Sequence, residues 1–146
     1  NALQDPAMIE RLYEASQAGV KIDLIVRGIC CLIPGRKYSR NIRVTRIVDT
    51  FLEHARVWYF GNGGKPKLFL GSPDWMRRNL YRRIEAVTPI LDPDLKRELS
   101  DMLSIQLSDK RKACFVDDHL RNRWKSARPQ KEKIRSQYTF YEYLKG

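Results

Sequence analysis

The hydrophobic positions in the first part of the chain follow a helical period and then the two-residue period of a strand. Met8, Ile9, Leu12, Tyr13 and Ser16 recur at helical spacing and share one face. Asp5-Pro6 supplies an N-cap and a first helical residue, and Gly19 follows the last turn. The next stretch, KIDLIVRG, places Ile22, Leu24 and Val26 on one side of a strand. A helix followed by an apolar strand is typical of an α/β unit.

The middle of the chain predicts a loop, a second helix and a hairpin. Residues 28 to 41 contain Pro34, Gly35 and Ser39 and indicate a loop. Apolar positions between residues 42 and 52 then follow the helical period, and this helix should stop just before His54. VWYF and KLFL are separated by GNGGKP, and an Asn-Gly pair between apolar runs favours a β-hairpin.

The remaining third continues the alternation. YRRIEAVTPIL alternates through Ile84, Ala86, Thr88 and Ile90 and predicts a strand, near a sheet edge because of Pro89. Asp92-Pro93 starts another helix, and KACFV is a short strand. Residues 121 to 135 indicate a basic, polar loop before a closing helix. The apolar positions of these two helices are Leu95, Leu99, Met102 and Leu103 in the first and Ile134, Tyr138, Tyr141 and Leu144 in the second.

These elements predict one α/β domain with a mixed sheet flanked by helices, spanning residues 1–146. A length of 146 residues and a hydrophobic content of 42% are ordinary for a single globular domain. No apolar run approaches the roughly 20 residues that span a bilayer. The chain starts at Asn1 without a signal-peptide pattern or an initiator methionine, so we expect a fragment of a larger protein.

The net charge of the chain indicates what kind of binding partner it favours. The 28 Lys and Arg residues outnumber the 17 Asp and Glu residues, so the net charge is +11 and favours polyanions. The three cysteines, Cys30, Cys31 and Cys114, show no metal-binding spacing, and we interpret them as reduced thiols of a cytosolic protein. The basic residues from 110 to 112 and from 121 to 135 could line a polyanion site or form a solvated loop. We expect Trp58, Tyr59, Phe60 and Phe69 to be core residues rather than a stacking platform.

Two residues at element ends could carry chemistry. Arg27 ends the predicted strand before Gly28, where ligands bind in open α/β sheets, and its guanidinium suits phosphate oxygens. The alternative is an arginine paired with a nearby carboxylate. His54 follows the predicted second helix, and an imidazole can transfer a proton or carry a phosphoryl group, although it could also be structural. We assign no role to His119.

His54, Arg56, Ser72 and Asp74 form an H-x-R … G-S-x-D pattern that resembles half of the phospholipase D motif, H-x-K … G-S-x-N. Arg56 replaces the lysine of that family, Asp74 replaces its asparagine, and Gly61 stands where its acidic residue would be. The family also uses two such halves. We therefore expect no phosphodiester hydrolysis, and Arg56 is a phosphate ligand only by this partial resemblance.

Four longer stretches resemble the C-terminal domain of the phospholipase D-like polyphosphate kinases. They are KIDLIVRGICCLIPG, NIRVTRIVDTFLEHARVWYF, GSPDWMRRNLYRRIEAVTPILDP and RSQYTFYEYLKG. The resemblance implies that Arg27 and His54 contact ATP, that His54 gives or takes a proton, and that Arg83 binds phosphate. The family usually has serine at Cys31 and an acidic residue at Arg40.

The resemblance also implies what lies outside this chain. The preceding domain would carry the histidine that becomes phosphorylated and most of the Mg²⁺ site, and ATP/ADP and polyphosphate would be the substrates. We expect contacts with the preceding domains, a homo-oligomer, and a location in the cytoplasm or at the periphery of a membrane. Two alternatives stay open: a polyanion or nucleic-acid-binding module without chemistry, and a phospholipase D-like phosphodiesterase half-site that works as a dimer.

Overall fold

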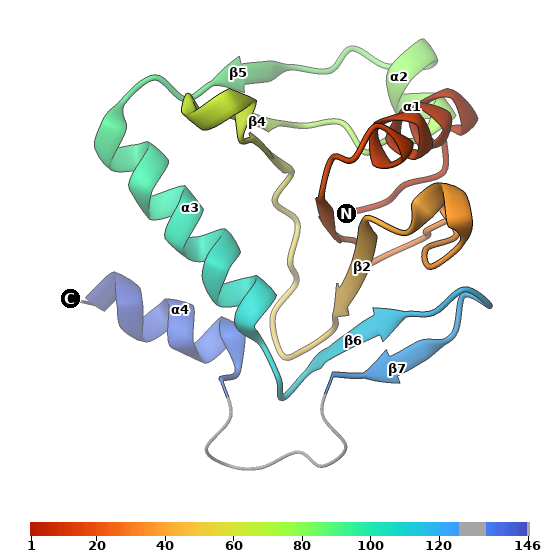
Figure 1. Ribbon diagram of the computed structural model, residues 1–146. Coiled ribbons are helices and arrows are strands. Elements are labelled where there is room, and N and C mark those ends of the chain that lie inside the picture. Colours follow the sequence, from red (N-terminus) through yellow and green to blue (C-terminus); the bar gives the residue numbers. More distant parts are fainter. Residues whose placement is uncertain (126–133, 146) are drawn as a thin grey trace.

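The computed structural model describes residues 1–125 and 134–145, which form helices packed around two β-sheets (Figure 1). The mixed α/β class predicted from the sequence is confirmed. The strands, however, divide into a four-stranded and a three-stranded sheet rather than one. Within the described residues, no helix is long and apolar enough to cross a membrane.

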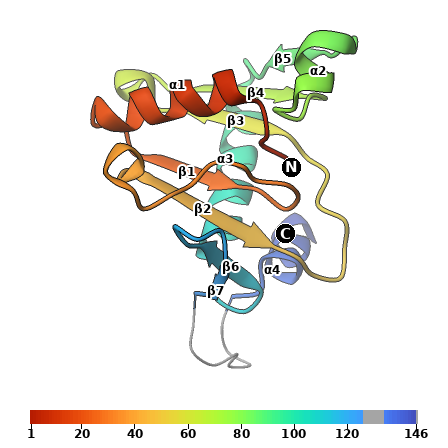
Figure 2. The same ribbon diagram turned by 90° about the vertical axis from the view of Figure 1, so that its right-hand side faces the viewer.

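The larger sheet has the strand order β1-β2-β6-β7. Strands β1 (Ile22–Ile25) and β2 (Ile42–Ile47) run parallel, while β6 (Ala113–Val116) and β7 (Asn122–Trp124) are added antiparallel. Figure 2 shows α1 (Pro6–Gln17) lying above β1. The main core lies between this helix and the sheet, and its buried residues are Leu3, Ile9, Val26, Leu32, Ile42, Val44 and Val116.

The smaller sheet is an antiparallel meander of β3 (Val57–Phe60), β4 (Lys67–Gly71) and β5 (Val87–Pro89). The predicted hairpin between the first two strands is confirmed. Its connection, residues 61–66, is longer than a two-residue turn and contains a 3₁₀ turn at Asn62–Gly64, in which Asn62 and Gly63 take positive φ of 45° and 60°. Pro89 lies on the edge strand as predicted, where its missing N–H costs no ladder bond.

Both predicted Asp-Pro helix starts are confirmed. Asp5 accepts a hydrogen bond from the Met8 amide at 3.0 Å, and Asp92 accepts from the Leu95 amide at 2.9 Å at the start of α3 (Pro93–Ser108). A further short helix, α2 (Arg77–Arg82), was not predicted, and α4 (Ser136–Lys145) begins just after Ile134. Helix α3 packs on α4 and has no fully buried residue.

Four sequence predictions are wrong in detail. Tyr59 and Phe60 were expected in the core, but they are 50% and 52% exposed. The stretch from 42 to 52 is not a helix: residues 42–47 are strand β2, and Val48, Phe51 and Leu52 are exposed. The β-branched residues of this stretch favour a strand. Its apolar positions matched a helical period only because the buried residues of the strand and the exposed residues of the following connection were counted together. The predicted strand of residues 81–91 is reduced to β5 because α2 occupies its beginning. The predicted loop of residues 121–135 contains β7, and its residues 126–133 lie outside the described residues.

Candidate phosphate-binding site

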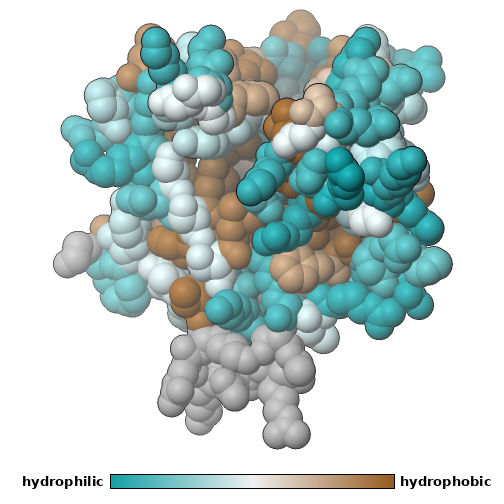
Figure 3. Space-filling model, in the orientation of Figure 1, coloured by the Kyte–Doolittle hydropathy of each residue, from teal (hydrophilic) through white to brown (hydrophobic). Residues whose placement is uncertain are grey.

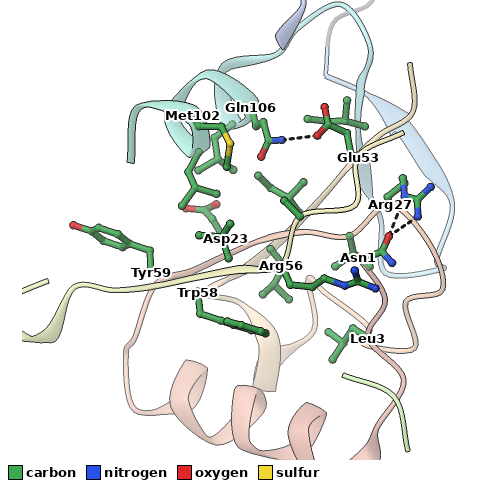
Figure 4. A pocket seen from close by; sticks show the side chains of 18 of the residues that line it. Asn1, Leu3, Asp23, Arg27, Glu53, Arg56, Trp58, Tyr59, Met102 and Gln106 are labelled. Atoms are coloured by element: carbon green, nitrogen blue, oxygen red, sulfur yellow. Dashed lines mark hydrogen bonds between the residues drawn. The ribbon is translucent and has the colours of Figure 1, made fainter. Parts of the chain in front are cut away.

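An open cavity of about 640 Å³ lies between the start of the chain, strands β1 and β3, and helix α3. Its lining includes the apolar Trp58, Met102 and Leu103 and the charged Arg27 and Arg56. Figure 4 shows the two arginines entering from different elements. The space-filling view shows a hollow with a hydrophobic interior and a hydrophilic rim (Figure 3). A cavity with an apolar wall and a few polar groups is the usual form of a small-molecule site.

Arg27 lies at the end of β1, where the sequence predicts a ligand-binding arginine. The amide of the preceding residue, Val26, still donates to the Thr45 carbonyl of β2 at 2.9 Å. The backbone that leads into Arg27 is therefore held by the parallel strand pair. Arg27 Nε and Nη2 donate to Asn1 Oδ1 at 3.0 and 2.7 Å. Among the described residues, no salt bridge includes Arg27. Its partner is therefore a neutral amide, and the alternative of a carboxylate partner is not observed.

Arg56 lines the same cavity but has a different electrostatic environment. Its Nε and Nη2 each donate to a carboxylate oxygen of Asp74 at 3.1 Å, and the two side chains are only 14% and 6% exposed. Burial opposes ionisation of Asp74, but the hydrogen bonds and the charge of Arg56 outweigh it and lower the pKa of this carboxyl. The H-x-R and G-S-x-D elements thus meet each other in a bidentate pair.

Asn1 connects the two arginines. Its Oδ1 accepts from Arg27, and its Nδ2 donates to Asp74 Oδ2 at 3.2 Å, on the carboxylate that holds Arg56. Figure 4 shows both guanidinium groups extending toward the Asn1 side chain from different elements. The backbone supports this arrangement, because the Gly28 amide donates to the Asn1 carbonyl at 2.8 Å. The sequence pattern contained no signal for this role of Asn1.

His54 lies on the connection of residues 48–56 between β2 and β3. Its neighbours Glu53 and Ala55 line the cavity, whereas His54 does not, and it is exposed. Its carbonyl accepts from Arg56 Nη1 at 3.0 Å. The structure therefore brings Arg27 and Arg56 to one cavity and places His54 beside its rim on the adjoining backbone.

Arg83 is the C-cap residue that follows α2, and it does not line the cavity. It approaches Glu85 at 3.8 Å, and Glu85 in turn accepts from Asn79 Nδ2 at 2.7 Å and from the Ser72 hydroxyl. Bonds from Ser72 and Asn79 lower the pKa of the Glu85 carboxyl. Ser72 therefore supports the Arg83 segment instead of facing the cavity. The R-N-x-x-x-R-x-E spacing of residues 78–85 was the sequence signal for this cluster.

Two arginines that the sequence placed among the possible polyanion ligands are already paired with a carboxylate. Arg121 and Arg123 both donate to Asp117, at 3.0 and 2.9 Å, across the β6–β7 turn. Arg128, Lys131 and Lys133 fall outside the described residues. Within residues 1–125 and 134–145, no group of three or more His, Cys, Asp or Glu side chains could hold a metal ion.

Comparison with known proteins extends this description. A family profile described as "Polyphosphate kinase C-terminal domain 2" matches residues 1–137. The polyphosphate kinase of Escherichia coli K12 is 47% identical over 147 residues, covering 100% of this chain and 21% of the relative. That of Synechocystis is 57% identical over 114 residues, covering 77% of this chain and 16% of the relative.

A solved structure agrees with these relatives. The crystal structure of polyphosphate kinase from Porphyromonas gingivalis superposes on the whole chain with a TM-score of 0.95 and 57% identity, over 22% of its own length. Ligands of open α/β sheets bind at the carboxyl ends of the strands, and a guanidinium there suits phosphate oxygens. The relatives are named polyphosphate kinases, which are phosphotransferases. The chain belongs to the polyphosphate kinase family. It spans about one fifth of the length of the curated relatives that it matches.

Proposed function

We propose that this chain is the C-terminal catalytic domain of an ATP-dependent polyphosphate kinase. The reaction is the reversible transfer of the terminal phosphate of ATP to a polyphosphate chain. The observation that supports a phosphate site here is the half-buried Arg27 guanidinium, which lines the cavity with a neutral amide as its partner. A guanidinium without an ionic partner keeps its charge available for a phosphate oxygen.

The transfer proceeds in two steps. A histidine of the preceding domain attacks the γ-phosphorus of ATP, its N–P bond forms as the P–O bond to ADP breaks, and the terminal oxygen of polyphosphate then displaces the histidine. Phosphoryl transfer depends mainly on positioning and on stabilising charge on the phosphate oxygens. Arg27 supplies that charge from a fixed strand end. Arg83, which lies outside the Arg27 cavity beside Glu85, is proposed as a further phosphate ligand only from the family resemblance. His54 gives or takes a proton at the leaving or entering oxygen.

The Arg56–Asp74 pair organises this site. Because Asp74 occupies the Nε–Nη2 edge of the guanidinium and Nη1 donates to the His54 carbonyl, Arg56 contributes mainly by fixing these two groups and, through Asp74, Asn1. A phosphate contact of Arg56 would use the N–H groups that Asp74 and the His54 carbonyl leave free. Magnesium would neutralise charge on the phosphates, and we place its ligands mainly in the preceding domains.

The sequence-based expectations for partners belong to the same proposal. The preceding domains of the polypeptide complete the site, the full-length enzyme is a homo-oligomer, and it acts in the cytoplasm or at the periphery of a membrane. The relatives' greater length supports the first expectation. Sedimentation of the full-length enzyme and cell fractionation test the other two.

Two measurements test the catalytic assignment. Residues 1 to 146 alone, incubated with labelled ATP, should produce no polyphosphate, and robust synthesis would contradict a site shared with the preceding domain. In the full-length enzyme, His54→Ala should lower turnover about 10² to 10⁴-fold, the usual range for a lost proton donor or acceptor. Its thermal stability should change little because His54 is exposed. Near-normal turnover would make His54 a structural residue.

Phosphate binding by this domain can be tested separately. A phosphorus NMR titration with ATP and with polyphosphate should show binding that Arg27→Ala weakens. The net charge of +11 also suits a nucleic-acid-binding module, and single-stranded DNA competing equally with polyphosphate would favour that alternative. Product release from a model phosphodiester without added nucleotide would instead favour the phosphodiesterase half-site.

A further inference from the structure

The connection that carries His54 needs outside support to hold a fixed geometry. Residues 48–56 form no regular secondary structure, and the apolar side chains Val48, Phe51 and Leu52 are 63%, 60% and 71% exposed. An exposed connection of this kind is ordinarily among the more mobile parts of a domain. A proton-transferring imidazole, however, has to be placed within hydrogen-bond reach of the reacting oxygen.

The support comes from α4, at the far end of the chain. Gln137 is 6% exposed. Its side-chain amide forms two hydrogen bonds with the Phe51 backbone, as the backbone of a neighbouring β-strand would. The Phe51 amide donates to Gln137 Oε1 at 2.8 Å, and Gln137 Nε2 donates to the Phe51 carbonyl at 2.7 Å. Two opposed bonds to one residue fix both the position and the rotation of its backbone.

The same glutamine reaches the residue next to His54. Gln137 Nε2 also donates to Glu53 Oε1 at 3.1 Å, and Gln106 Nε2 of α3 donates to Glu53 Oε2 at 3.2 Å (Figure 4). Glu53 is therefore held between two amides from two helices. Arg56 Nη1 binds the His54 carbonyl from the other side, so the backbone around His54 is restrained both before and after it.

Helix α4 is itself anchored where it begins. The Ser136 amide donates to the buried Asp109, between α3 and β6, at 2.7 Å. Arg135 adds a second tie to the connection itself, because it donates to the two carboxylate oxygens of Asp49 at 2.8 and 2.6 Å. The anchored side of α4 is thus the side that carries Gln137. The chain of contacts runs from the junction of α3 and β6, through α4, to the His54 connection.

We infer that Gln137 is a positioning residue for His54, acting through Phe51 and Glu53. The inference rests on the proposed function, because it requires that His54 takes part in the reaction. Displacing a catalytic group by about 1 Å can cost about 100-fold in rate even when the change lies away from the chemistry. Gln137 would therefore affect turnover without touching either substrate.

The test is Gln137→Glu in the full-length enzyme. The new carboxylate has the same shape but cannot donate to the Phe51 carbonyl, and it faces the Glu53 carboxylate. We expect kcat to fall about 10- to 100-fold with little change in the KM for ATP. Adding Glu53→Gln returns a donor to the pair and should recover part of the lost kcat. Gln17→Glu is the matched control, since Gln17 is exposed on α1 and bonds only within its own helix.

A His54→Ala background separates this inference from the proposed function. If Gln137 acts through His54, Gln137→Glu should cost nothing further in that background, and a second full loss there would overturn the inference. Wild-type kcat in the single variant would also overturn it. If His54→Ala alone leaves turnover intact, the proposed role of His54 fails, and the positioning role fails with it. If Gln137→Glu does not fold, Glu53→Ala can replace it, with kcat again compared in the wild-type and His54→Ala backgrounds. Glu53→Ala removes the bonds to Gln106 and Gln137 but leaves the two bonds between Gln137 and Phe51.

Discussion

Asp109 offers the sharpest test of how this domain is held together. It lies between α3 and β6 with its side chain fully buried. One carboxylate oxygen accepts from the backbone amides of Arg111, Lys112 and Ala113 at 2.9, 2.7 and 3.0 Å. The other oxygen accepts from the Ser136 amide at 2.7 Å, across 27 residues of sequence. A single carboxylate therefore joins the end of α3, the start of β6 and the start of α4.

The substitution Asp109→Asn keeps the shape and removes the charge. If its oxygen keeps the three local bonds, its NH₂ group meets the Ser136 amide, donor against donor. A hydrogen bond to a charged group is worth about 1.5–3 kcal/mol and a neutral one about 0.5–1.5 kcal/mol. At the midpoints of these ranges, one lost bond and three weakened bonds sum to about 6 kcal/mol. That is a large share of the roughly 5–15 kcal/mol that usually stabilises a domain.

The loss should depend on pH. Burial opposes ionisation of Asp109, but the amides of Ser136 and Lys112 outweigh it, so its pKa lies below the ordinary 3.8. A carboxyl with a lowered pKa stabilises the fold above its unfolded pKa of about 3.9, and this contribution disappears as the pH falls through the folded value. The difference in unfolding free energy between wild type and Asp109→Asn should therefore be largest at pH 7 and should decrease in strong acid.

Urea unfolding at a series of pH values measures this difference. Asp94→Asn is the matched control, because Asp94 is exposed and pairs only with exposed Arg97 at 2.7 Å, a contact worth about 0–1 kcal/mol. Equal unfolding midpoints for the two variants at pH 7 would refute the reasoning. A difference that stays constant below the ordinary carboxyl pKa would show that charge is not the cause.

Three further predictions concern packing, thiols and ligand binding. A Cβ at Gly71 would lie 2.7 Å from a Trp58 ring carbon, so Gly71→Ala should cost about 1–3 kcal/mol in urea unfolding, whereas Gly61→Ala, with nothing within 4 Å, should cost less than half as much. Iodoacetamide should label exposed Cys31 well before buried Cys114, whose pKa is raised by burial; equal rates in a mass-spectrometric time course would contradict the burial. Polyphosphate binding should weaken steeply with added salt, and an affinity independent of salt would argue against an ionic site.

Much of the candidate site was predictable because its chemistry is local in sequence. Arg27 follows an apolar strand, and it lines a cavity at the end of that strand; its binding of phosphate stays a prediction. The Asp-Pro helix starts and the Asn-Gly turn were also predictable, because caps and turns involve residues a few positions apart. The stretch from 42 to 52 was mispredicted because its apolar residues fit both periods.

The pairings across the chain had no sequence signal. The H-x-R … G-S-x-D pattern grouped Arg56 with Asp74 but suggested a phosphate ligand rather than an ion pair, and nothing indicated that Asn1 would bridge this pair to Arg27. Nothing near His54 indicated that Gln137, 83 positions later, would brace its connection. Each contact needs only a common side-chain type, and such types occur at many positions.

The sequence by itself determined the mixed α/β class, the polyanion-directed charge, the family, and the arginine at the strand end. Only the tertiary structure decided which cations keep their charge available and which are already paired, because that depends on the carboxylate that folding brings within about 3 Å. It also decided what holds the histidine connection. Local propensity acts over a few residues, whereas a buried hydrogen bond can join any two positions that the packing of helices and sheets places together.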